Sequence, residues 1–249
     1  MPLPSLAHLE LGSGYTQDMT HAVQAAGTLP EPDDGRSAVA GSSRAVHGAR
    51  HAPTAPHDRY RPYRLYDRLV METSKPAPGA GPGTALVLID LMPRIVALPL
   101  APHTGEEVAA RCVRLAEAFR AGGRPVVAVR VERPNVAEQP PGSGFVEGVA
   151  RPGDIKIVKR TVGAFHGTGL HEQLRGLGVD RLVLAGLVTT MGVESTARAA
   201  SDHGYEIEFV EDAMSAFAAD EHAFAVGRIF PRFGEVHAAA SYLKALAAE

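Results

Sequence analysis

The sequence predicts an α/β domain with a six-stranded, mostly parallel, doubly wound (Rossmann-like) sheet and helices on both faces. From residue 84 onward, short apolar runs alternate with longer segments of helical periodicity. The first run, TALVLID (84–90), is continuously apolar, as expected of a strand buried on both faces. The intervening helical segments are long enough for right-handed crossovers between parallel strands, so an alternating βα pattern indicates this fold.

Each expected element has a local signal. Apolar runs rich in valine, isoleucine and leucine mark the strands, and glycine ends three of the helices, at Gly123, Gly178 and Gly204. A proline- and glycine-rich loop separates the second and third strands. We expect strands at 84–90, 124–131, 154–159, 180–186, 205–212 and 234–239, and helices at 106–123, 168–178, 189–204, 220–230 and after 239.

Composition excludes several classes of protein. Apolar residues make up 45% and charged residues 21% of the chain, as in ordinary soluble domains. The net charge of −3 gives no reason to expect nucleic acid or an anionic membrane as a partner. No apolar run approaches the roughly 18–20 residues that span a bilayer, and the N-terminus lacks a secretory pattern. Cys112 is the single cysteine, which fits a reducing compartment, so we expect a cytoplasmic protein.

Composition changes sharply near residue 80, which predicts two regions: residues 1–82 and the domain at 83–249. The first is rich in glycine, proline, alanine, histidine and arginine without sustained periodicity, and we expect a disordered extension and linker there. Two alternatives stay open. The basic stretch Arg59–Arg68 could be a nucleic-acid-binding arm, and the natural start could be Met71, with the upstream residues a product of gene-start assignment.

In open parallel sheets, ligands bind at the carboxyl ends of the strands, near the point where the strand order reverses. This rule selects candidate residues before any motif is considered. They are Asp90, Arg130 to Glu132, Lys159, Gly186 to Thr189 and Glu211–Asp212.

Asp90 and Lys159 stand out because both are charged strand ends that fall on the ligand edge of one sheet. A carboxylate at the end of VLID must face a cavity or be paired, because burying it alone is unfavourable. The structural alternatives are a helix N-cap for Asp90 and a solvated strand end for Lys159. Gly192 lies in the first turn of the helix expected after the fourth strand, where glycine costs about 1 kcal/mol relative to alanine. It indicates either close packing or the approach of a ligand.

Three motifs in order resemble the isochorismatase-like (cysteine hydrolase) superfamily, in particular a subgroup of uncharacterised bacterial members. They are ALVLID with Asp90, KRTVGAFHGTGL with Lys159, and GLVTTMGVESTARAASDHGYEIEFVEDA. The resemblance implies a catalytic set of aspartate, lysine and cysteine, in which Asp90 and Lys159 match the first two. At the cysteine position this chain has Gly192, and Cys112, in the middle of a helix, cannot substitute for it.

Other departures concern substrate contacts and metals. Met92 stands where many relatives have glutamine, and LVTTM replaces a stretch that carries tyrosine and histidine in isochorismatases. The resemblance therefore does not identify the substrate of this protein. Because His103 and His166 do not match the metal-ligand spacing of nicotinamidases, we expect neither a metal nor a cofactor.

Without a thiol, the covalent route of the family has no nucleophile. True isochorismatases, which also carry glycine there, protonate a vinyl ether instead. The resemblance therefore implies acid-catalysed, non-covalent hydrolysis of an enol ether or related small carboxylate, with Asp90 as acid and Lys159 at the substrate anion. The alternative is a catalytically silent protein that binds small molecules in the same pocket. Substrate contacts are expected from Val188, Thr189, Met191 and Phe165.

The resemblance implies two further features. Relatives are usually homodimers or larger homo-oligomers, and the peptide bond matching Val188–Thr189 is often cis. Thr189 and Thr190 carry hydroxyl groups near the site, but no histidine base is evident beside them in the sequence. We therefore interpret both threonines as helix-cap residues.

Overall fold

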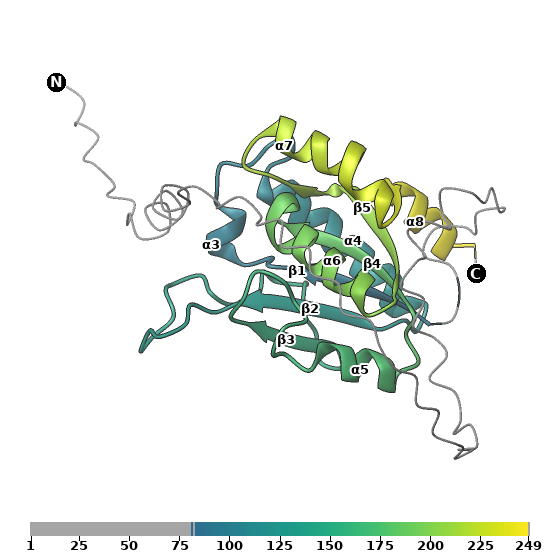
Figure 1. Ribbon diagram of the computed structural model, residues 1–249, viewed down its shortest axis with the longest axis horizontal. Coiled ribbons are helices and arrows are strands. Elements are labelled where there is room, and N and C mark those ends of the chain that lie inside the picture. Colours follow the sequence, from purple (N-terminus) through teal and green to yellow (C-terminus); the bar gives the residue numbers. More distant parts are fainter. Residues whose placement is uncertain (1–80, 82, 249) are drawn as a thin grey trace, which may run out of the picture. The chain divides into compact units, whose positions relative to one another are not determined.

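A computed structural model of the protein describes residue 81 and residues 83–248. The extension predicted for residues 1–82, the basic arm at Arg59–Arg68 and the alternative start at Met71 lie outside these residues, apart from residue 81. The account below concerns the α/β domain that begins at residue 83 (Figure 1).

The domain is built on a six-stranded sheet in which every neighbouring pair of strands is parallel. The order β3-β2-β1-β4-β5-β6 starts at the middle with β1 and grows outward in both directions. The predicted doubly wound, Rossmann-like architecture is therefore confirmed. The strands are β1 (Thr84–Ile89), β2 (Val126–Val131), β3 (Ile155–Lys159), β4 (Arg181–Leu187), β5 (Glu206–Ser215) and β6 (Gly234–His237).

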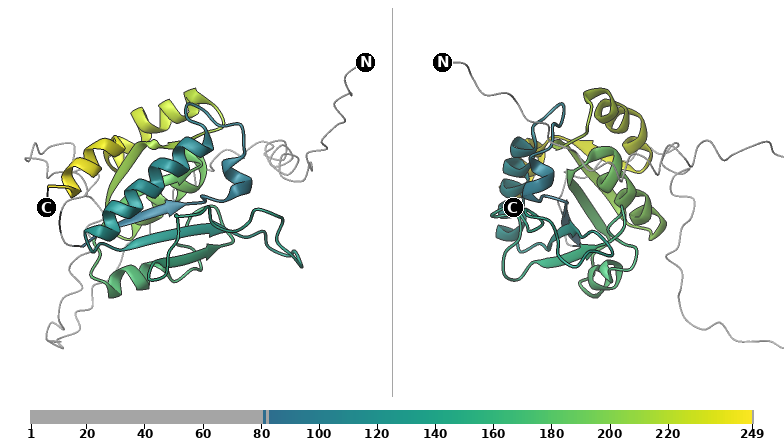
Figure 2. Two further views of the ribbon diagram at one scale, coloured as in Figure 1. Left: turned by 180° about the vertical axis from the view of Figure 1, so that it is seen from behind. Right: turned by 90° about the vertical axis from the view of Figure 1, so that its left-hand side faces the viewer.

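Helices cover both faces of the sheet, and each face has its own apolar core. One core joins the sheet to α4 (Gly105–Ala121) and α8 (Ala239–Leu246), with Cys112 buried in it. The other joins it to α5 (Leu170–Gly176) and α6 (Glu194–Asp202). Seen from the side in the right panel of Figure 2, the sheet lies between α4 and α6. No helix within the described part of the chain is long and apolar enough to span a membrane.

Two predicted helices differ from the observed ones. The segment 189–204 begins as a π-helix, η1 (Thr189–Val193), before α6, and 220–230 divides into α7 (Ala219–Phe224), η2 (Ala225–Ile229, a π-helix) and η3 (Phe230–Arg232, a 3₁₀-helix). In η1 the Val193 amide bonds the Val188 carbonyl, five residues back. The apolar pattern does not reveal such changes of helical period, and π-turns occur frequently at functional sites.

Two further differences concern the carboxyl edge. β5 extends to Ser215 rather than ending at 212, because Met214 and Ser215 still pair with β4. A short helix, α3 (Pro93–Val96), follows β1 and was not predicted. It is only one turn long, so it leaves too little periodicity to detect.

Helix α4 begins at a capping box. The Thr104 hydroxyl accepts a hydrogen bond from the Glu107 amide at 3.2 Å, and the Glu107 carboxylate accepts one from the Thr104 amide at 2.9 Å. Two amide groups that the helix leaves unpaired are thereby satisfied. The helix packs against β1, β4 and β5, so the capping box helps to stabilise the core on this face of the sheet.

We expect Thr104→Ala to lower the free energy of unfolding by about 1 kcal/mol, because an N-cap hydroxyl is lost. For a domain of this size the melting temperature should fall by about 2–4 °C. Thr104→Ser, which keeps the hydroxyl, is the matched control. Thermal unfolding followed by circular dichroism checks both variants, and a serine variant as unstable as the alanine variant would contradict the capping role.

Candidate active site

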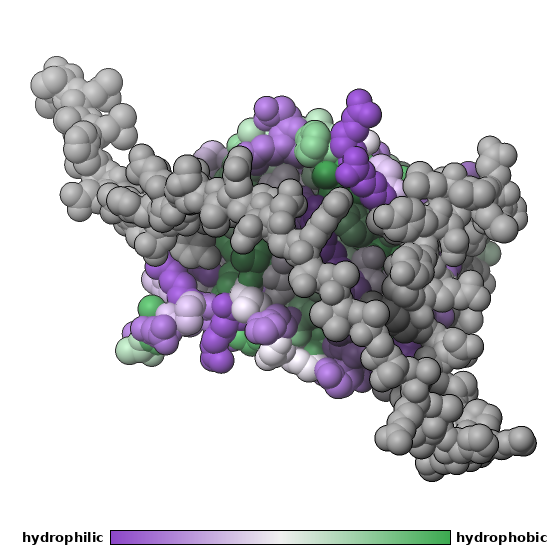
Figure 3. Space-filling model, viewed as in Figure 1, coloured by the Kyte–Doolittle hydropathy of each residue, from purple (hydrophilic) through white to green (hydrophobic). Residues whose placement is uncertain are grey.

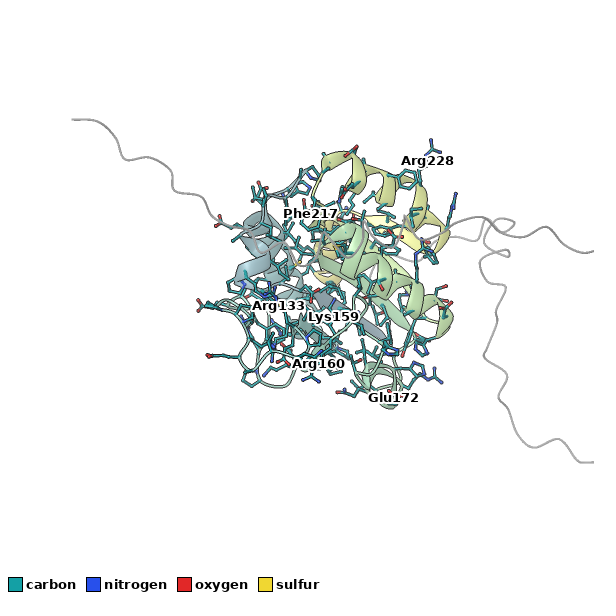
Figure 4. The ribbon with its side chains drawn as sticks, turned by 60° about the vertical axis from the view of Figure 1, so that its left-hand side comes forward. Arg133, Lys159, Arg160, Glu172, Phe217 and Arg228 are labelled. Carbon is teal, nitrogen blue, oxygen red and sulfur yellow. The ribbon has the colours of Figure 1, made fainter. Side chains whose placement is uncertain are left out.

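The strand order reverses between β1 and β4, and the candidate site lies at the carboxyl ends of these strands. Gly186 in β4 pairs with Ile89 in β1, and a Cβ atom at Gly186 would collide with the Ile89 backbone. Glycine is required there for the two strands to approach. Asp90 follows β1 directly, and Lys159 is the last residue of β3. Figure 4 shows Lys159 at this edge.

Asp90 and Lys159 form a buried ion pair. The distance between Lys159 Nζ and Asp90 Oδ2 is 2.7 Å, and only 2% and 9% of the lysine and aspartate side chains are exposed. Lys159 also donates a hydrogen bond to the Val162 carbonyl. The second carboxylate oxygen, Asp90 Oδ1, is buried and has no hydrogen-bond partner among residues 83–248. Asp90 Oδ1 is therefore left for another donor or acceptor.

Burial dominates the electrostatics of Asp90. Desolvation raises the pKa of the Asp90 carboxyl, while the positive charges of Lys159 and Arg94 lower it without cancelling the rise. The backbone at Asp90 has φ 51°, in the left-handed region that few residues other than glycine adopt. An aspartate held in this conformation with a raised pKa is a candidate acid.

Gly192 completes the site from the other side. A Cβ atom at this position would lie 3.2 Å from both Asp90 Oδ2 and Lys159 Nζ, and 2.9 Å from Ile89 Cγ2. The residue at the predicted cysteine position therefore faces the ion pair directly. The Thr196 hydroxyl fixes this turn, because it donates to the Gly192 carbonyl at 2.6 Å and accepts from the Ala164 amide at 3.1 Å.

Thr189 is not a helix cap. Val188 holds the N-cap position, and the Thr189 hydroxyl lies 3.0 Å from His222 Nδ1. Both side chains are buried, burial lowers the pKa of His222, and the His103 ring lies edge-on to the His222 ring at 6.4 Å. The expectation that no histidine accompanies Thr189 was wrong, since α7 brings one from 33 residues away. No local pattern in the sequence signals this pair.

The other expected substrate-contact residues differ in their surroundings. Val188, which precedes η1, is buried, and Met191 within η1 is 38% exposed. Phe165 packs its ring against His203 and Tyr205 in the core. A role in substrate binding stays a prediction for these residues. The cis peptide bond is at Leu187–Val188, so its expected place one residue later was wrong.

Three of the remaining charged strand ends, Arg130, Glu132 and Asp212, have partners of their own. Arg130 pairs with Glu132 at 2.7 Å, and Asp212 accepts a hydrogen bond from the Ala239 amide at the start of α8. Asp212 therefore stabilises a helix start. Across the portion of the chain that the structure describes, no group of three or more histidine, cysteine, aspartate or glutamate side chains is arranged to hold a metal ion.

We expect Gly192→Ala to destabilise the fold by about 1–3 kcal/mol, as overpacking does in tight cores. The new methyl group would press on Ile89 Cγ2, which is attached to a branched Cβ and cannot swing away. Gly176→Ala is the control, because nothing lies within 4 Å of its added Cβ. Its melting temperature should equal or exceed that of the unmodified protein. Equal stability of the two variants would show that the turn at Gly192 has room.

Comparison with known proteins agrees with this fold and these motifs. The model of the isochorismatase domain matches residues 84–241. The uncharacterised isochorismatase family protein YecD of Escherichia coli O157:H7 is 40% identical over 180 residues, which are 66% of this chain and 96% of that protein. YwoC of Bacillus subtilis, another uncharacterised isochorismatase family protein, is 35% identical over 179 residues, 65% of this chain and 93% of that protein.

Solved structures give the same result. An isochorismatase family protein from Burkholderia thailandensis superposes with a TM-score of 0.63 at 38% identity, covering 69% of this chain and all of that one. The predicted family is confirmed by sequence and by structure. The chain belongs to the isochorismatase family of hydrolases.

Proposed function

We propose that the protein hydrolyses a small carboxylate-bearing substrate, an enol ether or a related compound, by non-covalent acid catalysis. The observation that carries this proposal is the juxtaposition of Gly192 with a buried carboxyl group. Asp90 has a raised pKa, and the residue facing it has no side chain. The site thus offers a proton donor and no thiol nucleophile.

In this mechanism Asp90 is the general acid. Its protonated carboxyl transfers a proton to the enol ether carbon, which produces an oxocarbenium ion. Water adds to that ion and returns a proton to Asp90, and the resulting hemiketal breaks its C–O bond to give a ketone and an alcohol. Asp90 Oδ1 suits this role because Lys159 contacts Oδ2 and leaves Oδ1 without a partner in the described domain.

Lys159 has two effects that act in opposite directions. Its ammonium stabilises the Asp90 carboxylate that remains after proton transfer, and it provides a positive charge for a substrate anion. The same charge makes Asp90 a stronger acid, because it opposes the rise in pKa that burial causes. The opposing effects of burial and of Lys159 together set how readily Asp90 gives up its proton.

Neither the Thr189 hydroxyl nor the Cys112 thiol supports a covalent route. The Thr189 hydroxyl is buried and already bonded to His222 Nδ1. Cys112 is buried in α4, its thiol contacts the Ala213 carbonyl, and burial raises its pKa far above the usual range. Neither group replaces the thiolate that an acyl-enzyme mechanism requires.

The competing proposal is a catalytically silent protein that binds small molecules, and Gly192 favours it as well, since it removes the family nucleophile. A measurement of turnover distinguishes the hydrolase from the binding protein. A thermal-shift screen that finds cyclic carboxylates as ligands, without turnover of any of them, would favour the binding protein.

Homo-oligomerisation and a cytoplasmic location stay predictions. Light scattering coupled to size-exclusion chromatography tests the oligomeric state.

We expect Asp90→Asn to lower kcat for isochorismate or a related enol ether by roughly 10²–10⁴-fold, because a general acid contributes about this much. The substitution keeps the shape of the side chain and removes its proton. Product release is measured with a coupled pyruvate assay, and Thr104→Ala serves as a control for small losses of stability. Equal rates for Asp90→Asn and the unmodified enzyme would refute the assigned role.

The raised pKa of Asp90 also sets a pH dependence. Because the active form is protonated, kcat/KM should be highest below this pKa and should fall as the pH rises through it. The decline should start above the ordinary aspartate range, and the residual activity of Asp90→Asn should lack it. A pH–rate profile that rises across the same interval would mean that the ionised carboxylate is the active form.

A further inference from the structure

One buried histidine joins the surface helix α7 to η1, the turn that carries Gly192. The structure describes all six residues of α7, and among them only His222 is buried while the others are exposed. In the view of Figure 3, the surface at the place where Figure 1 labels α7 carries hydrophilic residues beside apolar ones. A surface helix usually directs apolar side chains at the core. At this position a polar ring takes their place.

The buried ring makes a specific contact with η1. The Thr189 hydroxyl oxygen lies 3.0 Å from His222 Nδ1, and the two residues are 0% and 7% exposed. Burial lowers the pKa of His222, and the nearby His103 lowers it further, so the neutral imidazole is favoured. A buried polar group that loses its partner is costly. Thr189 and His222 therefore depend on each other.

The end of β5 fixes the segment from which His222 projects. Ala216 exchanges two backbone hydrogen bonds of 2.9 Å with Ala101. The Ser215 hydroxyl donates to the His103 carbonyl at 2.7 Å and accepts from the His103 amide at 3.1 Å. The His103 ring in turn lies edge-on to the His222 ring at 6.4 Å. The histidine thus lies on a segment that is tied to the loop before α4.

η1 needs support from outside its own backbone. No side chain caps it at Val188, and its wide turn closes by a hydrogen bond of 3.3 Å onto the Val188 carbonyl. The Thr196 hydroxyl holds the far end of the turn through the Gly192 carbonyl at 2.6 Å. Thr189 is the first residue of η1, so its bond to His222 holds the near end.

The position of η1 matters because Gly192 lies against the ion pair. A Cβ atom at Gly192 would be 3.2 Å from both Asp90 Oδ2 and Lys159 Nζ, so the backbone of this residue covers the pair. Burial is the largest cause of the raised pKa of Asp90. If the turn moved away, water would reach the carboxyl group and weaken this effect. The turn therefore influences both the shape of the site and the acidity of Asp90.

We propose that His222 is a positioning residue of the active site, which acts through the Thr189 hydroxyl to hold η1 and Gly192 against Asp90. In this role the histidine transfers no proton and supplies a fixed hydrogen-bond partner for the turn. A misplacement of about 1 Å, even one caused from outside the reacting groups, can lower a rate by roughly 10²-fold. The effect on rate rests on the proposed function, whereas the effect on Asp90 can be measured without substrate.

The test compares His222→Leu, which removes the hydrogen bond, with His222→Asn, whose amide reaches the position of Nδ1. Selective ¹³C labelling of aspartate allows the Asp90 carboxyl to be titrated by NMR, and Asp90→Asn identifies its signal. We expect the pKa of Asp90 to fall toward the ordinary aspartate range in His222→Leu and to recover in His222→Asn. Thr189→Val keeps the shape of threonine without its hydroxyl and should also lower this pKa, so it replaces His222→Leu if that variant does not fold.

The rate provides a second readout. With isochorismate as substrate, His222→Leu should lower kcat roughly 10–100-fold with little change in KM, and His222→Asn should recover most of the rate. Thr104→Ala is the stability control, because it weakens the start of α4 and should leave the Asp90 titration unchanged. A His222→Leu protein that is less stable but keeps the Asp90 pKa would overturn the proposal. A shifted Asp90 titration without hydrolysis by the unmodified protein would support the positioning role and refute the proposed reaction.

Discussion

The buried ion pair between Asp90 and Lys159 is the interaction on which the rest of the site depends. Removing two charges from water is unfavourable unless each finds the other at good geometry. The sheet provides that geometry, because β1 and β3 both end at the edge where ligands bind, with β2 between them. The pair is not fully satisfied, since Asp90 Oδ1 has no partner in the described domain and burial outweighs the attraction of Lys159. The proposed chemistry rests on this shortfall, because it leaves one carboxylate oxygen without a partner.

The turn between β4 and α6 is fixed on two sides. On one side Gly192 lies against the ion pair, and Thr196 holds its carbonyl. On the other side Thr189 bonds His222, whose pKa is lowered by burial. A neutral hydroxyl–imidazole contact tolerates burial far better than an isolated charge. The backbone of η1 is therefore held between a charged pair and a neutral pair, which restricts its movement relative to Asp90.

Sequence reasoning found the parts of the site that topology determines. Asp90 and Lys159 could be predicted because both are charged residues at strand ends, and parallel strands align those ends at one edge of the sheet. The contacts that it missed depend on loops and on distant elements. His222 comes to Thr189 through α7, and the Arg94 amide reaches the Gly142 carbonyl in the loop after β2. Their positions follow from tertiary packing, which leaves no periodic signal along the chain.

Gly192 decides which chemistry the retained residues can support. The space for a side chain there is limited by Ile89 as well as by the ion pair, so the surrounding core is fitted to glycine. A thiol could not be added by changing this residue alone without moving part of β1. In the proposed mechanism the lysine has no thiolate to stabilise, and its charge acts on Asp90 and on the substrate. In that mechanism the same aspartate and lysine deliver a proton instead of assisting a nucleophile.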